Sequence, residues 1–195
     1  SCLVGSEMCI RDRAIAEQKC REFLKKNPTN VYAMSLLSDI AKKFGYYDDA
    51  EILLENAVKF SPDDGEIRMK YALILRLKQK FTETMEQVNI LCEKFPDNLS
   101  YQAQKASEIM QNGYHSEAID LFEKIIKENP YNFSAMTSKG HAEKTLGKTD
   151  KAIESYKSAY KIKNDHGEAY FSLSNLKTYK FSDKELDVMK NQLKR

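Results

Sequence analysis

The sequence contains no tryptophan, and its 195 residues include only three histidines, four cysteines, four prolines and seven glycines. It also lacks an excess of charge of one sign, because the formal net charge is only +2. So small a charge does not give the electrostatic footprint that a phosphate backbone demands, and we expect no nucleic-acid partner. Since no apolar run approaches the ~20 residues of a membrane-spanning helix, we expect no membrane partner either.

The motifs that usually carry chemistry are also missing. The sequence has no Gly-x-x-x-x-Gly-Lys-Ser/Thr loop, no Gly-x-Gly-x-x-Gly, no paired Cys-x-x-Cys and no His-Glu-x-x-His. The histidines are scattered: His115 falls in a predicted turn and His166 in a predicted link, where solvated side chains are the ordinary outcome, and only His141 could face a groove. We therefore expect no catalytic residue, no cofactor-binding residue and no metal ligand, and we do not expect this chain to be an enzyme.

What the sequence does contain is a strict period of 34 residues. All four prolines follow it, at Pro28, Pro62, Pro96 and Pro130. A column of turn residues has the same spacing, at Gly45, Gly113 and Gly147, with Gln79 as the exception. A period of this length is typical of repeat proteins in which each unit packs on its neighbours.

Each period predicts two helices joined by a tight turn. Residues 31–43 place apolar side chains at the i, i+3, i+4, i+7 spacing of a helix with one buried face. A second helix is predicted from about Asp49 to Phe60, with Asp48 as its cap and Glu51 as the capping-box partner. Pro62 ends the unit, because proline lacks the backbone N–H that would continue the helix.

Three columns of the repeat predict how the helices pack. Small residues align in the first helices, at Ser38, Ala72, Ala106, Gly140 and Ser174. Small residues also align in the second helices, at Ala16, Ala50, Thr84, Ala118 and Ala152. Large residues follow four places later, at Cys20, Leu54, Val88, Phe122 and Tyr156. The two helices of a unit must approach closely at the small columns.

This pattern resembles the tetratricopeptide repeat, over the range from Ala14 to about Phe181. The resemblance implies an all-α fold, a tetratricopeptide-repeat α-solenoid in which antiparallel helix pairs form a right-handed superhelix with the first helices on its concave side. Two columns depart from the family: the Trp column holds Met34, Arg68, Gln102, Met136 and Tyr170, and the Tyr column holds Ala41, Leu75, Ile109, Glu143 and Lys177. A pentatricopeptide array, which would imply RNA, is the nearest alternative, but that family usually has a period one residue longer and a more basic face.

The register divides the chain into segments. Residues 1–13 resemble a translated transposase adapter of the kind used in DNA sequencing; the alternative is an ordinary N-terminal segment, and we interpret them as not native, with the natural N-terminus missing. The array is predicted to cover residues 14–181, as a partial repeat (14–30), complete repeats (31–64, 65–98, 99–132 and 133–166) and a half repeat (167–181). Residues 182–195 are predicted to start a capping or linker helix toward a missing C-terminal domain.

Individual side chains at inward positions give two further expectations. Cys20 and Cys92 fall in inward-facing columns, which favours two buried thiols over a disulfide or a metal pair, and a reducing, cytoplasmic compartment. Gln102 and Lys105 occupy columns that should be apolar, so we expect the unit 99–132 to be the weakest.

The concave side is the candidate binding site. Residues spaced i, i+4, i+7 share one face of a helix, so three first helices each present a group: Ser35, Asp39 and Lys42; Met69, Leu73 and Arg76; Thr137, His141 and Lys144. The resemblance implies that a protein or peptide binds in this groove. The face does not reproduce the Lys and Asn pattern with which chaperone-binding repeats clamp a C-terminal carboxylate, so we assign no particular peptide.

The end of the chain carries a second resemblance. A sixth first helix is predicted from Glu168 to Tyr179, after which the register breaks and Ser182 with Glu185 forms a capping box for a new helix. The apolar face of that helix is predicted to hold Leu186, Met189 and Leu193. The junction is similar to the one at which tetratricopeptide repeats lead into the sulfotransferase domain of a bacterial family; the matching residues are Ala169, Tyr170, Ser172, Leu173, Asn175, Leu176, Lys177, Thr178, Phe181, Ser182 and Asp183.

That second resemblance implies a parent enzyme whose catalytic domain is absent from this chain. Such an enzyme transfers sulfate from 3′-phosphoadenosine 5′-phosphosulfate to a hydroxyl group, and the repeats would be its interaction scaffold. The alternative is a free-standing adaptor, a co-chaperone-like module that binds peptides.

Overall fold

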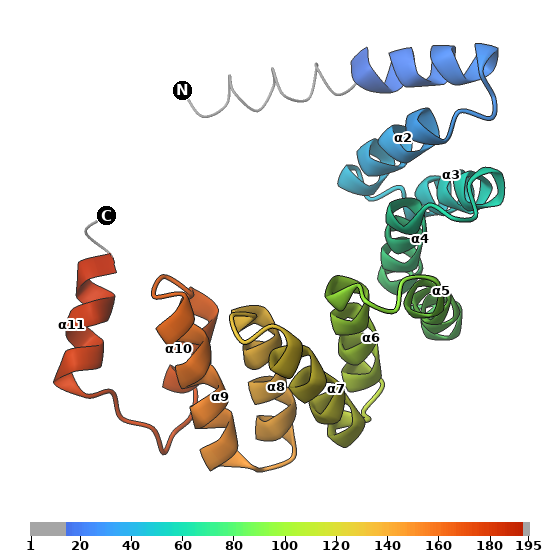
Figure 1. Cartoon of the computed structure of the whole chain (residues 1–195). Helices are drawn as coiled ribbons and strands as arrows, with labels where there is room; N and C mark the ends of the chain where they lie inside the picture. The colour runs from blue at the N-terminus through green and yellow to red at the C-terminus, as the bar shows by residue number, and fades with distance from the viewer. Residues whose placement is uncertain (1–14, 193–195) are drawn as a thin grey trace, which may run out of the picture. The chain divides into compact units, whose positions relative to one another are not determined.

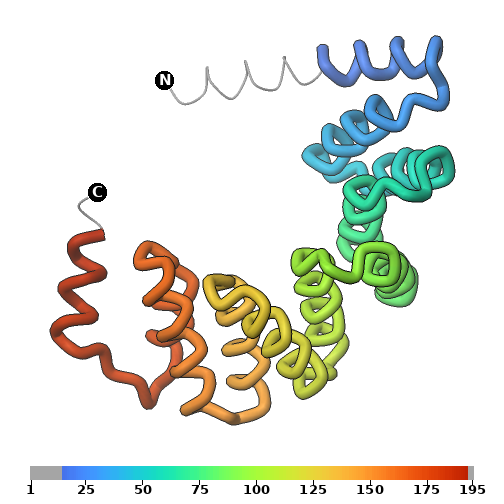
Figure 2. Tube along the Cα trace, viewed as in Figure 1, coloured from blue at the N-terminus to red at the C-terminus, as the bar shows by residue number. Residues whose placement is uncertain are grey.

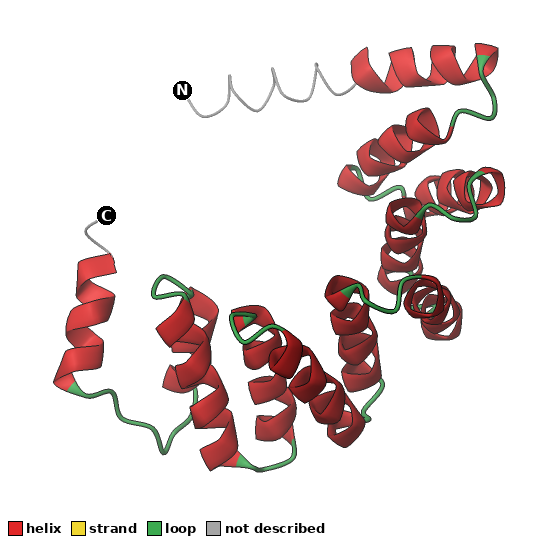
Figure 3. Cartoon of the chain, in the orientation of Figure 1, coloured by secondary structure: helices red, strands yellow, loops and turns green. Residues whose placement is uncertain are grey.

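The computed structural model describes residues 15–192, and all the regular structure in that range is helical (Figures 1 and 3). A helix over residues 15–26 comes first. It is followed by α2 (Val31–Lys43), α3 (Tyr47–Phe60), α4 (Gly65–Leu77), α5 (Phe81–Lys94), α6 (Leu99–Gln111), α7 (His115–Glu128), α8 (Phe133–Thr145), α9 (Thr149–Ile162), α10 (Gly167–Ser174) and α11 (Asp183–Gln192). The predicted all-α fold class is confirmed. No helix in the described range is long and apolar enough to cross a membrane.

The helix starts follow the period of the sequence. First helices begin at Val31, Gly65, Leu99, Phe133 and Gly167, and second helices begin at Tyr47, Phe81, His115, Thr149 and Asp183. The chain divides into two compact units, Ser1–Pro96 and Asp97–Arg195. Within each unit a helix packs against the next one along the chain, from α2 to α5 in the first unit and from α6 to α10 in the second (Figure 2).

The first helices begin and end with recurring local devices. At their starts, the side chains of Asn30, Asp64, Asn98 and Asn132 accept hydrogen bonds from backbone N–H groups of the first turn. At their ends, the chain takes a positive φ at Gly45 (78°), Gly113 (90°) and Gly147 (74°), as the glycine column predicts. Gln79, which stands in the glycine column, also has a positive φ of 59°, so the turn has the same backbone conformation without glycine.

The predicted capping box of the second helix is wrong. Helix α3 begins at Tyr47, two residues before the predicted start, and its N-cap residue Tyr46 makes no side-chain hydrogen bond. The carboxylate of Asp48 pairs with Lys78 instead, and Glu51 bonds to Lys78 and Lys80. The two lysines lie at the end of the next first helix, so these carboxylates join neighbouring repeats rather than cap their own helix.

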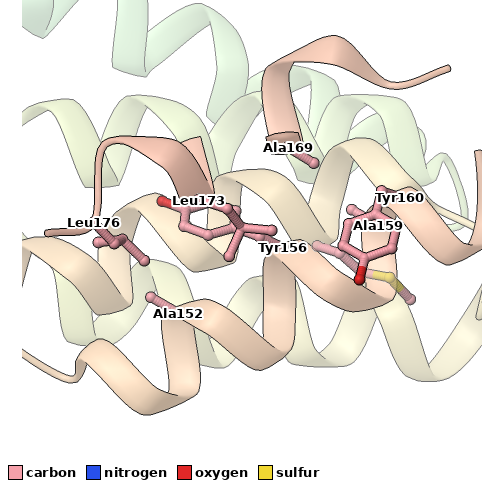
Figure 4. Packing of buried hydrophobic residues seen from close by; sticks show 8 residues of the cluster. Ala152, Tyr156, Ala159, Tyr160, Ala169, Leu173 and Leu176 are labelled. Carbon is pink, nitrogen blue, oxygen red and sulfur yellow. The ribbon is translucent and has the colours of Figure 1, made fainter. Parts of the chain in front are cut away.

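The small and large columns meet as predicted. Ala50, Thr84, Ala118 and Ala152 are all at most 1% exposed, as are Leu54, Val88, Phe122 and Tyr156. The closest approach is at Gly140, where an added Cβ would lie 2.6 Å from Tyr156 Cε1. Figure 4 shows Ala152 and Tyr156 of α9 gathered with Ala169 and Leu173 of α10 in one buried cluster.

The thiols are less buried than expected. Cys20 and Cys92 are not joined by a disulfide, and both have intermediate exposure. The helix of residues 15–26 is open on the side of Cys20, where a cavity lies between it and α2. In the column of Cys92, Val58 and Ile126 are also half-buried, whereas Tyr160 is buried. In the unit 99–132, Gln102 and Lys105 are likewise half-buried.

The last pair of helices departs from the prediction. Helix α10 ends at Ser174, five residues before the predicted end, and Ser174 is exposed rather than packed in its small column. Helix α11 does not break the register, because Asp183 lies 34 residues after Thr149. However, Leu186 stands in the column that holds Ala152 one repeat earlier, and α11 buries none of its residues. A large residue there keeps α11 from packing closely, since a second helix needs a small one.

The capping of α11 is confirmed in part. Glu185 accepts hydrogen bonds from the backbone N–H and from the hydroxyl of Ser182, both at 2.8 Å, so the predicted partner does reach back. On the predicted apolar face, Leu186 is 36% exposed and Met189 is half-buried. Leu193 lies outside the described residues.

Candidate interaction face of the first helices

The nine candidate residues differ widely in how accessible they are. Ser35 and Thr137 are buried, at 6% and 2% exposed. Lys42 and Lys144 are exposed. The remaining candidates are half-buried: Asp39, Met69, Leu73, Arg76 and His141. Some of them contact neighbouring helices, and others stay open to solvent.

In the first unit, two candidates join α2 to α4. Lys70 Nζ donates to Ser35 Oγ at 2.8 Å and to Asp39 Oδ2 at 2.7 Å. Lys70 was missed by the sequence analysis, because it lies one residue away from the candidate Met69 on α4. The signal that could have found it is the spacing of 31 residues between Asp39 and Lys70, which places opposite charges on adjacent first helices.

In the second unit, His141 joins three helices. Its Nε2 lies 3.2 Å from Glu168 Oε1 of α10, and its Nδ1 lies 3.0 Å from Tyr156 Oη of α9. A neutral imidazole has one N–H, and a carboxylate only accepts; the proton therefore belongs on Nε2, and Tyr156 donates to Nδ1. Burial raises the pKa of Tyr156 to about 12, so the phenol remains a donor at neutral pH.

Thr137 is also committed to a neighbour. Its hydroxyl donates to the backbone oxygen of Phe133 at 2.9 Å and lies 2.9 Å from His166 Nε2. The His166 ring meets the ring of Phe133 edge to face, with centroids 4.9 Å apart. His166 is therefore not the solvated side chain that the sequence suggested. Together with His141, it holds the link before α10 against α8.

Comparison with known proteins also finds the repeat that the 34-residue period predicts. Residues 133–166 match the family model described as Tetratricopeptide repeat. Among solved structures, MamA superposes with a TM-score of 0.70 at 19% identity, covering 83% of this chain and 95% of that one. YrrB, described as a TPR protein with an unusual peptide-binding site, gives 0.67 at 16% identity and covers 85% of both chains. The chain has the tetratricopeptide-repeat fold.

Part of this chain is similar to a segment of a much longer curated protein. The probable UDP-N-acetylglucosamine–peptide N-acetylglucosaminyltransferase SPINDLY of Arabidopsis thaliana is 30% identical over 95 residues, which is 49% of this chain. The chain spans 10% of the length of that relative. MamA of Desulfovibrio magneticus RS-1 is a further structural match, with a TM-score of 0.64 at 13% identity over 84% of this chain and 92% of that one. At such identities the solved structures establish the tetratricopeptide-repeat fold alone.

Large apolar side chains remain exposed beside the candidate residues that are hydrogen-bonded to neighbouring helices. On α2, Tyr32 is 79% exposed and Leu36 is 52% exposed, and both share a face with Ser35 and Asp39. On α10, Phe171 is 67% exposed. Tyr32 and Leu36 were not predicted as candidates because they lie in the row beside the i, i+4, i+7 row of Ser35 on α2. Phe171 stands in the same repeat column as Ser35 and Thr137, but no candidate was taken from α10.

A cavity of about 410 Å³ adjoins the open residues of α2. It lies between α2 and the helix of residues 15–26, and its walls include Phe23, Tyr32 and Leu36. Lys19 stands among the lining residues. Among the described residues, no group of three or more His, Cys, Asp or Glu side chains is placed to hold a metal ion. The arrangement suits binding through apolar contact and hydrogen bonds.

Proposed function

We propose that this chain is a protein-interaction scaffold that binds a peptide or a partner protein along the face of its first helices. The observation that carries the proposal is the pair of exposed apolar side chains Tyr32 and Leu36 on α2, beside the Lys70 bonds that hold α2 to α4. YrrB, which shares the fold, is described as having a peptide-binding site, and this supports the proposal. The absence of a disulfide between Cys20 and Cys92 fits the reducing, cytoplasmic setting that we propose.

The polar pairs prepare this face for binding. The Lys70 bonds to α2 and the His141 bonds to α9 and α10 hold adjacent helices in place before any partner arrives. A rigid face loses less conformational freedom on binding, which leaves more of the contact energy as affinity. The candidates Ser35, Asp39, Thr137 and His141 thus shape the face, while Lys42 and Lys144 remain exposed to a ligand.

The test is to select peptides against the protein and measure the loss of binding in variants. Leu36→Glu should weaken selected peptides by about tenfold or more, because a charge replaces an exposed apolar contact on α2. The matched control is Ile52→Glu, which changes an equally exposed residue (59%) on the second helix α3. If Ile52→Glu weakens binding as much as Leu36→Glu does, the first-helix face is not the site.

A second proposal is that the repeats belong to a sulfotransferase and position its acceptor polypeptide. The observation that favours it is the Phe-Ser-Asp junction, at which Ser182 and Glu185 start α11 in the geometry of a capping motif. The name of the relative SPINDLY describes a peptide-modifying transferase, which supports the idea of repeats joined to such a domain. The alternative is a free-standing adaptor that binds peptides.

Calorimetry separates these alternatives. The described first helices α2, α4, α6 and α8 bond N-terminal N–H groups to Asn or Asp side chains, which compete with phosphate groups there. The second helices α3, α5, α7 and α9 each carry an acidic residue in the first turn, which would repel phosphate. We therefore expect no binding of 3′-phosphoadenosine 5′-phosphosulfate to residues 1–195, and binding to a protein extended along the natural reading frame. If the extended protein fails to bind the nucleotide, the adaptor remains as the function.

A further inference from the structure

A polar cavity of about 360 Å³ lies between α7, α8 and α9, where the repeats 99–132 and 133–166 meet. Helix α8 contributes Lys139 and Glu143, α7 contributes Glu123, and α9 contributes Lys151, Glu154 and Ser155. Because a helix turns through about 100° per residue, Lys139 and Glu143 point to a different face of α8 than Thr137 and His141 do. The cavity is therefore separate from the proposed peptide-binding face.

Two charged residues of this cavity stand in columns that are mainly apolar elsewhere. The column of Lys139 holds Leu37, Tyr71, Lys105 and Leu173, and the column of Glu143 holds Ala41, Leu75, Ile109 and Lys177. Replacing a buried ion pair by apolar residues of similar volume is often neutral or stabilising. The repeat can therefore fold without Lys139 and Glu143, as the repeat 65–98 does with Tyr71 and Leu75, and stability does not explain the pair.

The carboxylate of Glu143 retains capacity for a further donor. Its side chain is only 2% exposed, and Oε2 accepts from Ser155 Oγ at 2.7 Å. Oε1 lies 3.5 Å from Lys139 Nζ, longer than the ~2.7–2.9 Å of a charge-assisted hydrogen bond. Lys139 Nζ is nearer to Glu123, at 2.9 Å. A carboxylate oxygen can accept two hydrogen bonds, so Glu143 Oε1 can receive an N–H from a ligand.

The net charge of the cavity indicates whether a ligand should be a cation or an anion. The carboxylates Glu123, Glu143 and Glu154 face the ammonium groups of Lys139 and Lys151, which leaves one negative charge in excess. Although burial alone would lower it, the pKa of Lys139 is raised by Glu123 and Glu143, so Lys139 stays charged and the excess persists at neutral pH. An anion would meet this excess, whereas a single cation balances it.

We propose that this cavity binds a compact organic cation with N–H donors, a guanidinium or primary ammonium group that bonds to Glu143. Such a group is available from a free amine or guanidine, or from an Arg or Lys side chain of a bound polypeptide. The volume is near the lower end of the roughly 300–1,000 Å³ of ligand sites, which suits a ligand of this size.

The experiment titrates the whole protein with two probes, methylguanidinium and the tripeptide acetyl-Gly-Arg-Gly-amide, and follows amide NMR signals. We expect saturable shifts that centre on α8 and α9 for at least one probe, and comparison of the two separates a free cation from a side chain. Glu143→Gln should weaken binding by about tenfold or more, because the buried charge is lost. Glu117→Gln removes an equal charge from an exposed residue of α7 that does not line the cavity, and it should leave the affinity unchanged.

A double variant distinguishes lost binding from lost folding. Lys139→Leu with Glu143→Leu introduces residues that the same columns hold at Leu173 and Leu75. It should keep the helical signal and the melting midpoint while binding neither probe. The proposal is overturned if wild type shows no saturable shift with either probe, if Glu117→Gln weakens binding as much as Glu143→Gln, or if the folded double variant still binds.

Discussion

At the scale of single residues, one contact shows most directly how the two helices of a repeat fit. Gly140 leaves the space that the ring of Tyr156 fills, and Tyr156 is fully buried. The same ring also donates to His141, so the size of residue 140 affects both the core and the first-helix face. Position 140 of α8 therefore needs a residue without a side chain, although glycine is normally unfavourable inside a helix.

Gly140→Ala should destabilise the protein by about 1–3 kcal/mol, because the new Cβ clashes with Tyr156 and outweighs the gain of about 1 kcal/mol that alanine gives a helix. The measurement is the midpoint of urea unfolding. Gly167→Ala is the matched control, because a Cβ at Gly167 meets no atom within 4 Å. A stabilised Gly140→Ala variant would mean that Tyr156 moves aside at little cost.

Gln79→Gly should stabilise the protein by up to about 1 kcal/mol, because glycine adopts a positive φ without the steric cost that Gln79 bears. The other turns of this column already use glycine. Gln111→Gly, in the last turn of α6, provides the control and should destabilise by about 0.5–1 kcal/mol, since it adds backbone freedom to a helical residue. Equal effects of the two changes on the thermal midpoint would contradict this account.

At the scale of helices, what the sequence could predict depends on the range of the interaction. Gly45 and Pro62 act through their own backbone geometry, so their columns locate turns and ends without knowledge of the neighbours. Asp48 and Lys70 act across repeats, on Lys78 and on Asp39, and a reading of one helix at a time assigned Asp48 wrongly and overlooked Lys70. The early end of α10 is a similar case, since Leu176 beyond it is buried by tertiary packing.

For the candidate face as well, the sequence could predict the features that depend on one helix but not the contacts between helices. The helical period placed the candidates of α2 and α8 on one face of each helix, but it could not separate residues that contact neighbouring helices from those that remain open. His141 looked like a lone histidine in sequence, and its partners Tyr156 and Glu168 lie 15 and 27 residues away. That separation follows from the path of the chain through α9 and α10 and from no local pattern.

Helix α11 is attached mainly through one carboxylate. Glu185 Oε1 accepts from Tyr160 Oη at 2.6 Å and from Tyr179 Oη at 2.5 Å, while Oε2 accepts from Ser182. Although burial alone would raise it, these hydrogen bonds lower the pKa of Glu185 from 4.5 to about 2. A lowered pKa stabilises the folded state above the unfolded value, and this contribution is lost as the pH falls from about 4.5 to about 2.

Glu185→Gln should therefore speed amide hydrogen exchange in α11 at neutral pH, because an amide accepts these hydrogen bonds less strongly than a carboxylate does. Wild type should lose protection of α11 as the pH falls below about 4.5, and the variant should not show that step. Asp187→Asn is the control, since the Asp187 side chain is 71% exposed on the same helix. If both variants exchange alike, Glu185 does not hold α11.

At the scale of the whole molecule, stability comes from contacts between neighbouring helices. The buried cluster around Leu54 draws on residues 34–74, and the cluster around Tyr156 draws on residues 136–176. Each cluster lies inside one of the two compact units. In repeat proteins, stability is approximately a sum of repeat and nearest-neighbour terms, so a unit with its own core can fold as a separate fragment.

Fragments 1–96 and 97–195 should each keep a helical circular-dichroism spectrum and a cooperative thermal transition. In fragment 97–195, Gly140→Ala should cost the same free energy as in the whole chain, within about 0.5 kcal/mol, because Tyr156 and its neighbours lie in that fragment. Placing Gly140→Ala in the whole chain should leave amide exchange in α2 and α3 unchanged. An unfolded fragment 97–195 would show instead that the cluster around Tyr156 cannot hold its repeats without the preceding helices.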